Sequence, residues 1–299
     1  MSSFTTLLKN IMSPFCRGFF FILGTLACVT LFTLAISGAT NAKADVHSEL
    51  TIREQSNADG KRQSLSKTAP YFVQIPIRGF IGDNKLNSQT IEKQLVEIET
   101  TLNTKYLKGI LLLVDSPGGT VSDSSMIYEL LQEFKQKHKI PIYAFVEGLS
   151  ASGAVYISSC ADKIYSTSSA LIGSVGTLIE TVNVSQTLEK VGVKALAITA
   201  GEHKDLLNPT RPMSENDITW AQHICDSSYN DFVNVVSQNR PLISSEDLKE
   251  RLGARVFPSK EALEYGFIDV NNASRNQTLQ DLSIETGVDV LQYAVIELE

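Results

Sequence analysis

Short apolar runs and helically spaced apolar residues take turns along the middle of the chain. The apolar runs predict strands, two of them uninterrupted as is typical of parallel strands buried on both faces, at residues 71–77, 109–114, 140–146, 163–165 and 194–199. Apolar residues at helical spacing lie between these runs and predict helices at residues 88–102, 126–134, 151–158 and 184–191. Such alternation implies right-handed crossover connections and an α/β core.

Beyond residue 200 the pattern becomes mainly helical. It predicts a long amphipathic helix, two shorter helices and a closing strand, at residues 216–238, 245–252, 259–265 and 291–298. The chain has no internal repeat, and its 299 residues are enough for one large core. We therefore expect one folded domain at 71–275, followed by a C-terminal tail at 276–299 that packs on this domain or on a neighbouring subunit.

The N-terminal region contains a long apolar segment. Residues 18–42 carry no charge, and about 20 apolar residues are enough to span a bilayer as a helix. Lys9 and Arg17 precede this segment, whereas acidic residues soon follow it, so the positive-inside rule favours a cytoplasmic N-terminus at 1–17. We expect a single-pass anchor at 18–42, a polar linker at 43–70 and the rest of the chain outside the cytoplasm.

A cleaved signal peptide is the alternative for the same segment. Ala42-Lys43-Ala44 has the small-x-small form of a cleavage site, although the apolar region is longer than the usual core of a signal peptide. In both interpretations the domain is exported, and they differ only in whether it stays attached to the membrane.

Composition narrows the function classes. With 43% hydrophobic and 20% charged residues the chain is of the globular type, and a net charge of −7 without a dense Lys/Arg cluster argues against nucleic acid as a partner. Cys160 and Cys225 could pair in an oxidising compartment, but their spacing favours two buried thiols over a disulfide framework or a zinc site. We expect no cofactor and no metal.

The first candidate for chemistry is Ser152, in Gly148-Leu149-Ser150-Ala151-Ser152-Gly153-Ala154. Its small neighbours leave room beside the hydroxyl for a substrate backbone, and the N–H groups at a helix start favour developing negative charge. Upstream, Asp115-Ser116-Pro117-Gly118-Gly119 can form a turn that directs N–H groups toward an oxyanion. These features indicate acyl transfer; the alternative is that Ser152 only caps a helix.

A serine nucleophile needs a base, and the residues alone leave its identity open. Of four histidines, only His203 lies in a loop that could turn inward. Its neighbour Lys204 is the rival, because burial lowers the pKa of a lysine enough for it to accept a proton. A solvated Lys204 without a catalytic role is the third interpretation.

Together these motifs resemble the signal peptide peptidase A family, membrane-anchored Ser-Lys peptidases with a ClpP/crotonase-like fold of repeated β-β-α units. Ala151-Ser152-Gly153-Ala154 is similar to the family's nucleophile motif, and Gly201-Glu202-His203-Lys204-Asp205 is similar to its base segment. The resemblance covers roughly residues 71–269. It implies Ser152 as nucleophile, Lys204 as general base, Ser174 as the residue that orients the lysine, and the backbone N–H groups of Gly119 and Gly153 as the oxyanion hole.

Two positions depart from the family pattern. Ala154 replaces a glycine after the nucleophile, and we expect its methyl to lie where the substrate strand approaches. Asp115 stands where many relatives have asparagine, which adds a negative charge near the oxyanion turn. We expect both departures to alter rate or specificity without removing a reacting group.

The resemblance implies a serine endopeptidase that hydrolyses remnant signal peptides and unfolded segments through an acyl-enzyme. It further implies a homo-oligomeric ring, an octamer, in which a neighbouring subunit supplies Lys204. The anchor would hold the ring in a bacterial inner membrane with the catalytic domain on the extracytoplasmic side. We expect small or apolar substrate side chains to fit shallow pockets lined by residues such as Leu149.

Three other functions stay open. A crotonase-type enzyme acting on acyl-CoA would use the same oxyanion geometry, although no adenine-binding signature is visible. A membrane-tethered scaffold would need no chemistry at Ser152. A Ser-His peptidase would use His203 in place of Lys204.

Overall fold

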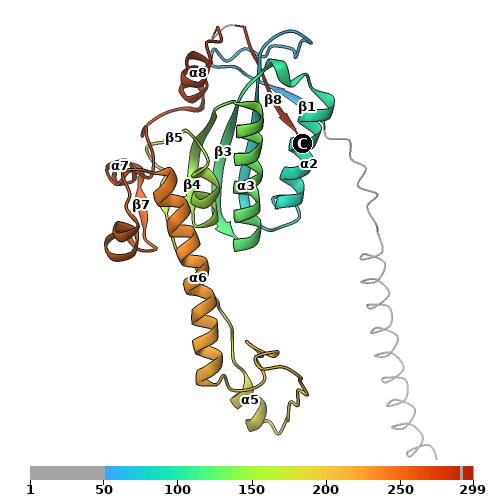
Figure 1. The fold of residues 1–299 in the computed structure, drawn as a ribbon, viewed down its shortest axis with the longest axis vertical. Coiled ribbons are helices and arrows are strands. Elements are labelled where there is room, and N and C mark those ends of the chain that lie inside the picture. The colour runs from blue at the N-terminus through green and yellow to red at the C-terminus, as the bar shows by residue number, and fades with distance from the viewer. Residues whose placement is uncertain (1–50, 290–291, 299) are drawn as a thin grey trace, which may run out of the picture. The chain divides into compact units, whose positions relative to one another are not determined.

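Strands and helices alternate along much of the chain in the computed structural model, which describes residues 51–289 and 292–298 (Figure 1). These residues belong to one compact unit, Leu50–Glu299. The elements in chain order are β1 (Ile52–Gln55), β2 (Tyr71–Ile81), α2 (Ser88–Thr101), η1 (Thr104–Tyr106), β3 (Leu107–Gly119), α3 (Val121–His138), β4 (Ile142–Ala151), α4 (Gly153–Ser158), β5 (Lys163–Ser166), β6 (Leu171–Gly173), α5 (Ser185–Lys190), α6 (Glu215–Asn239), η2 (Asp247–Leu252), β7 (Val256–Pro258), α7 (Ser259–Glu264), α8 (Arg275–Glu285) and β8 (Ala294–Leu298).

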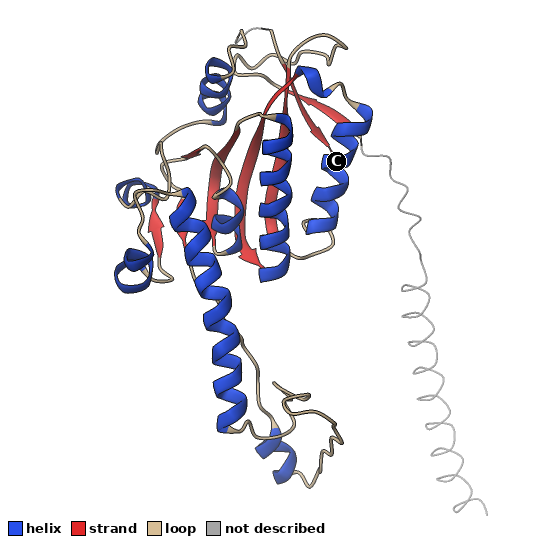
Figure 2. Cartoon of the chain, in the orientation of Figure 1, coloured by secondary structure: helices blue, strands red, loops and turns tan. Residues whose placement is uncertain are grey.

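The strands form an eight-stranded sheet with helices packed against it (Figure 2). Its order is β1-β8-β2-β3-β4-β6-β7, with β5 paired to β4 off this path. The inner pairs are parallel, and only the edge pairs β1–β8 and β6–β7 are antiparallel. The predicted α/β fold is therefore confirmed.

The long central strands are each divided into two segments. The register of β2 against β3 shifts between Arg78 and Phe80, and that of β3 against β4 shifts between Val114 and Ser116. Similarly, the first part of β4 pairs with β5 and its last residues pair with β6. Two strand segments thus precede each of α2, α3 and α4, in agreement with the expected β-β-α units.

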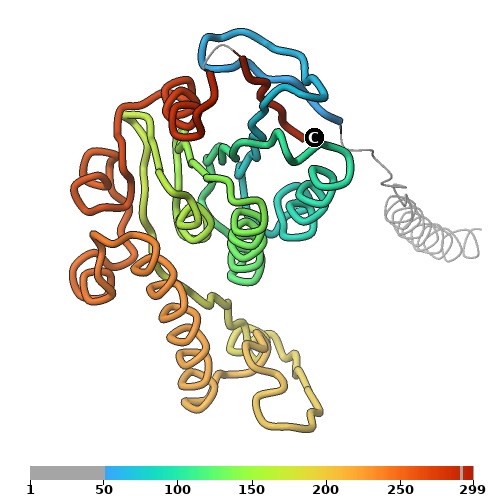
Figure 3. Tube along the Cα trace, turned by 45° about the horizontal axis from the view of Figure 1, so that its top comes forward, coloured from blue at the N-terminus to red at the C-terminus, as the bar shows by residue number. Residues whose placement is uncertain are grey.

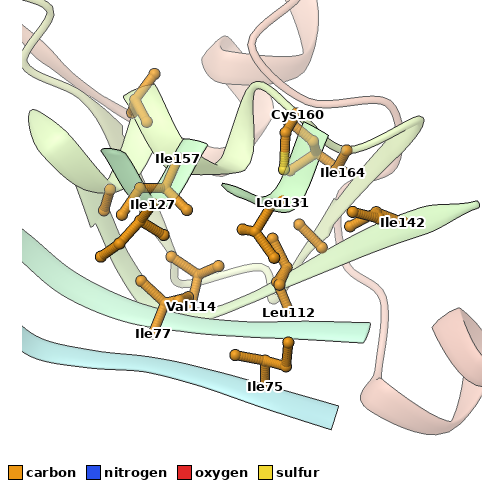
Figure 4. Close-up of a cluster of buried hydrophobic side chains, with 14 of the residues drawn as sticks. Ile75, Ile77, Leu112, Val114, Ile127, Leu131, Ile142, Ile157, Cys160 and Ile164 are labelled. Carbon is orange, nitrogen blue, oxygen red and sulfur yellow. The ribbon is translucent and has the colours of Figure 1, made fainter. Parts of the chain in front are cut away.

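Both faces of the central strands are buried because helices cover each face. Along β3, Leu112 and Val114 face the cluster shown in Figure 4, together with Ile127 and Leu131 of α3. Leu111 points to the opposite cluster, which contains residues of α8. This two-sided burial explains the uninterrupted apolar run of β3.

Cys160 lies in the larger cluster, and burial raises the pKa of its thiol to about 12. Cys225 is half-buried, and both cysteines are free thiols. Cys160 thus behaves as a small apolar core residue, as predicted from its sequence context.

Three sequence predictions about element positions are wrong. Residues 194–199 form no strand: Leu196 and Ile198 are 86% and 90% exposed, because no strand among the described residues lies beside them. The expected linker contains β1, which pairs with β8, so its polar residues lie at a sheet edge. The expected tail contains its predicted closing strand, β8, but it is not an appendage: it supplies α8 and β8, and β8 lies between β1 and β2 in the sheet. The domain therefore includes both segments.

The predicted membrane anchor at 18–42 lies outside the described residues. Within residues 51–289 and 292–298, no helix combines the length and the apolar character needed to cross a bilayer.

One helix carries a segment away from the sheet. The C-terminal half of α6 packs through Phe232, Val233 and Val236, whereas Asp217 is the one buried residue of its N-terminal half. The residues that precede α6 lie beyond its N-terminal end, around α5 (Figures 1 and 3). We call residues 178–214 and the N-terminal half of α6 the arm. Many of its apolar side chains are exposed: Leu178, Val182, Val191, Leu196, Ile198, Ile218 and Trp220.

Candidate active site

Ser152 occupies the sharp junction between β4 and α4. Its backbone has φ 54° and ψ −122°, a conformation that is costly for a residue with a side chain. It stands at the N-cap of α4, yet its side chain makes no capping hydrogen bond. The interpretation of Ser152 as a helix cap is therefore wrong, and its hydroxyl is available for another role.

Glycines allow the chain to pack around this junction. A Cβ on Gly118 would lie 2.7 Å from the Gly153 nitrogen and 2.8 Å from the Cβ of Ser152. Gly118 also has φ +94°, which side chains disfavour. The Ser-Pro-Gly-Gly segment was predicted as a turn but forms the end of β3, where Gly119 pairs with Ile81. The segment thus lies directly against the serine.

Ser152 lines a small cavity together with both predicted oxyanion residues. The cavity has a volume of about 20 Å³, and its walls are Gly119, Val121, Ser124, Ser152, Gly153, Tyr156, Gly176, Thr177, Ser228 and Phe232. A Cβ built on Gly153 would lie 3.4 Å from the Gly119 nitrogen, so the two backbone segments are close neighbours. Gly153 is the first residue of α4, where backbone N–H groups lack intrahelical acceptors.

Ser174 lies beside the nucleophile candidate because of strand pairing. In the β4–β6 register Ala151 is opposite Gly173, and the Ser152 N–H donates to the Gly173 carbonyl at 2.9 Å. Ser174 follows directly, half-buried and with φ 57°, and its N–H donates to the Arg255 carbonyl at 2.7 Å. The structure therefore brings Ser152, Gly119 and Gly153 together at the cavity and places Ser174 directly after the residue bonded to Ser152, although Ser174 itself does not line the cavity.

Lys204 is not brought to this site within one chain. It is exposed in the arm, and it is absent from the walls of the Ser152 cavity. Its loop is attached through Asp217 near the start of α6, whereas Ser228 farther along α6 lines the cavity. At 1.5 Å per residue the helix between Asp217 and Ser228 is about 17 Å long, more than a lysine side chain can bridge.

His203 lies in the same loop, is bonded to Asp217 near the start of α6, and is likewise absent from the walls of the Ser152 cavity. Its Nδ1 is 3.0 Å from the Asp217 carboxylate and its Nε2 is 3.5 Å from the Glu202 carboxylate. Its ring stacks on Trp220 with a centroid distance of 6.2 Å. Because a carboxylate accepts, Nδ1 carries the proton in the bond to Asp217. Neither candidate base reaches Ser152 of its own chain.

The two departures from the family pattern have structural roles of their own. Ala154 is fully buried in the core, so the expectation that its methyl meets the substrate is wrong: the helix turns that side inward. Asp115 accepts a hydrogen bond from the Leu149 N–H at 3.0 Å and thereby holds the end of β4 to β3. Leu149 does not line the Ser152 cavity, contrary to expectation.

Several side chains that enclose the cavity were not indicated by the sequence pattern. Tyr156 of α4 packs against Phe232 of α6 with ring centroids 5.1 Å apart, and Ser228 lies one turn before Phe232. Tyr156 lies four residues after Ser152, a helical spacing that could have placed it on the same side. Nothing local pointed to Phe232 or Ser228. Among the described residues, no His, Cys, Asp or Glu cluster is arranged to hold a metal ion.

Comparisons with known proteins identify related sequences and folds. The family model described as peptidase family S49 matches residues 134–289, and the Clp protease model matches residues 64–173. A protein of Enterococcus faecium provisionally named signal peptide peptidase SppA is 34% identical over 234 residues, covering 74% of this chain and 66% of that protein. A protein of Synechocystis sp. provisionally named protease slr0021 is 36% identical over 204 residues, covering 68% of this chain and 70% of that protein.

A ClpP1 mutant from Listeria monocytogenes overlaps 69% of this chain and 94% of its own, with a TM-score of 0.46 and 17% identity. The chain spans about two thirds of the length of the relatives from Enterococcus faecium and Synechocystis sp.. The S49 match extends over half of the chain and favours a peptidase over an acyl-CoA enzyme or a scaffold. The ClpP-like α/β fold and the S49 match agree, and the chain belongs to peptidase family S49, a family of hydrolases that cleave peptide bonds.

Proposed function

We propose that this chain is a serine endopeptidase in which Ser152 attacks the peptide carbonyl. The observation that carries the proposal is that the uncapped Ser152 hydroxyl, at a strained junction, shares one cavity with Gly119 and Gly153. Strained backbone of this kind clusters at catalytic sites because it aims a side chain at the substrate. The family membership supports the same chemistry.

The reaction would proceed through an acyl-enzyme. Neutral Lys204 takes the proton of the Ser152 hydroxyl while the oxygen attacks the scissile carbonyl, and the N–H groups of Gly119 and Gly153 stabilise the oxyanion. The protonated lysine then donates to the leaving amine, and water hydrolyses the ester. Ser174, which follows the strand paired with Ser152, would orient the lysine amine.

A neighbouring subunit would supply Lys204. The distance along α6 between the arm and the cavity supports this arrangement, since one chain cannot join the two ends of the dyad. The exposed apolar residues of the arm support it further, because apolar surface of this kind is typical of a contact with another protein. A head-to-tail contact that closes on itself produces a ring, and the octamer implied by the family resemblance belongs to this proposal.

Remnant signal peptides and unfolded segments near the membrane are the substrates that fit best. The name of the Enterococcus faecium relative supports signal peptides as substrates. The proposal places the ring at a bacterial inner membrane, anchored by residues 18–42, with the domain on the extracytoplasmic side. The small cavity, partly walled by Tyr156 and Phe232, favours small or apolar side chains on the amino side of the scissile bond.

Cavity size gives a specificity prediction. Tyr156→Ala should raise kcat/KM about tenfold for peptides with phenylalanine before the scissile bond, relative to alanine, because it opens the wall toward Phe232. The measurement is hydrolysis of a peptide pair that differs only at this residue. Tyr128→Ala is the matched control, because Tyr128 makes an edge contact with Tyr156 at 5.5 Å but does not line the cavity. An equal change in both variants would contradict the cavity assignment.

The base is tested by two substitutions in adjacent residues. Lys204→Ala should lower kcat about 10³-fold or more, because no other group takes the serine proton. His203→Asn should keep kcat within about fivefold, because an amide N–H can replace the Nδ1 donor to Asp217 but cannot accept a proton at pH 7. The readout is hydrolysis of an unfolded protein by the full chain in detergent. The reverse result would identify His203 as the base.

A further inference from the structure

Asp217 connects the first turn of α6 to the loop that carries Lys204. Its carboxylate is 5% exposed and accepts four hydrogen bonds: from His203 Nδ1 at 3.0 Å, Arg211 at 2.6 Å, the Ser214 N–H at 3.0 Å and the Ser214 hydroxyl at 2.8 Å. The Ser214 bonds complete a capping box at the start of the helix. The other two bonds extend beyond any capping role.

Arg211 extends the connection to the other side of Lys204. Its guanidinium binds Asp205 through two bonds, Nε to Oδ2 at 2.7 Å and one terminal nitrogen to Oδ1 at 2.8 Å, while its other terminal nitrogen binds Asp217. Such fork-shaped pairing fixes orientation as well as distance. Arg211 holds the pKa of Asp205 and of Asp217 below the usual range, so both carboxylates stay ionised.

The residues on both sides of Lys204 are therefore connected to one buried group, the Asp217 carboxylate. His203 on one side binds Asp217 directly, and Asp205 on the other side binds it through Arg211. The backbone between them is tightly turned: His203 has φ 57°, and the Leu206 N–H donates to the His203 carbonyl at 3.0 Å. For the Lys204 side chain itself, no hydrogen bond or ion pair is found within the described part of the chain, and Lys204 is exposed.

We infer that Asp217, Arg211 and His203 form a clamp that positions Lys204 for delivery into the Ser152 site of the neighbouring subunit. The inference rests on the proposed role of Lys204 as general base. A base must approach the nucleophile within hydrogen-bond reach, and a misplacement of 1 Å can cost about 10²-fold in rate. The clamp residues act through Lys204 and are positioning residues; none of them touches the substrate.

The clamp also affects the pH dependence of catalysis. A lysine held in a water-poor site has a lowered pKa, whereas one on a loosened loop returns toward its ordinary value of about 10.4. The charged groups around the loop are Glu202 and Asp205 within it, Arg211 behind it and Asp217 on α6. Among the residues that line the Ser152 cavity, the one titratable side chain besides the hydroxyl groups of serine and threonine is Tyr156.

The experiment compares Asp217→Asn with the wild type as full chains in detergent, over a series of pH values. We expect kcat to fall about 100-fold at neutral pH with KM changed less than about threefold. In the plot of kcat against pH, the rising limb should move to higher pH, so that activity partly returns in alkaline solution. A purely structural defect would lower kcat at every pH without moving the limb, and that result would overturn the inference.

Asp247→Asn is the matched control. Asp247 at the start of η2 likewise pairs with a serine and an arginine, the Ser244 hydroxyl at 2.7 Å and Arg251 at 2.8 Å, but it has no histidine partner and lies outside the arm. This variant should keep the wild-type kcat and the wild-type pH position of the rising limb. A shift of the limb in Asp247→Asn equal to that in Asp217→Asn would overturn the inference.

Arg211→Gln keeps the test decisive if Asp217→Asn does not fold, because Arg211 is only half-buried and lies outside the capping box. It should move the limb in the same direction, and combined with Asp217→Asn it should add little, since both act on one unit. If the rising limb of kcat against pH does not move in Arg211→Gln, the inference that Arg211 helps to position Lys204 is wrong.

Lys204→Ala, measured alongside, distinguishes failure of the proposed base from failure of the clamp. If it is active, Lys204 is not the base and both proposals fail. If it is inactive while Asp217→Asn retains the wild-type kcat and limb, the base assignment stands and the clamp alone is wrong.

Discussion

Ser152→Ala is expected to lower the kcat for hydrolysis of an unfolded protein by about 10⁴-fold or more, because removal of a nucleophile abolishes the covalent route. Binding should persist, since the backbone N–H groups of Gly119 and Gly153 and the walls of the cavity are unchanged. The measurement is release of labelled fragments from an unfolded protein by the full chain in detergent, with a fluorophosphonate probe as a second readout of the serine. The probe should label the wild type and not the variant.

The matched control for this substitution is Ser122→Ala. Ser122 is an exposed serine in the first turn of α3, next to Val121 at the cavity wall, and its own backbone is helical. We expect its kcat to stay within about twofold of the wild type, as is usual for a surface substitution. Activity retained in Ser152→Ala would mean that the strained junction is structural and would remove the nucleophile assignment.

The second large effect is the rescue of two inactive variants by each other. Ser152→Ala and Lys204→Ala are each expected to be inactive, but rings assembled from both contain sites in which one subunit supplies the serine and its neighbour the lysine. With equal co-expression and random order around a ring, about a quarter of the sites are intact, so about a quarter of the wild-type activity should return. The mixed protein is isolated through two different tags before the assay.

A dyad formed within one chain predicts no rescue, because every subunit then lacks one of its two groups. The control is co-expression of Ser152→Ala with Ser152→Gly, which both lack the nucleophile and should stay inactive in any arrangement. Full activity of a monomer after dilution would likewise contradict a shared site. These outcomes decide between the two arrangements without a structure of the assembly.

Local sequence was sufficient for most elements of the fold. Strand β3 and helix α6 were predicted because burial on two faces and burial on one helical face leave different apolar periods in the chain. The predicted strand at 194–199 failed for the complementary reason. Leu196 and Ile198 pack on no surface of the part of the chain that the structure describes, and a periodic pattern does not say which surface buries it. β1 was placed in a linker, and β8, although predicted as a strand, was placed in a tail, because pairing between strands far apart in the chain leaves no local signal.

The features around Ser152 that support the proposed chemistry could be identified largely from the sequence. Small residues around a serine, and a Gly-Gly pair at the end of a preceding strand, are requirements of close backbone approach, and such requirements act on neighbouring residues. For the same reason, the motif around Lys204 could be identified from the sequence, but the position of Lys204 relative to Ser152 could not. A motif specifies the residue types near a group and carries no information about the distance to a second motif.

The tertiary structure alone decided how these parts are arranged. The packing of α6 on α4 brings Phe232 and Ser228 to the cavity, and the same straight helix holds the Lys204 loop about 17 Å farther along, away from the serine of its own chain. The ties of Arg211 and Asp217 to the residues on both sides of Lys204 depend on the fold of the arm. Contacts of this kind join residues whose sequence separation follows no period, because they arise from the packing of whole elements and not from the local conformation of the chain.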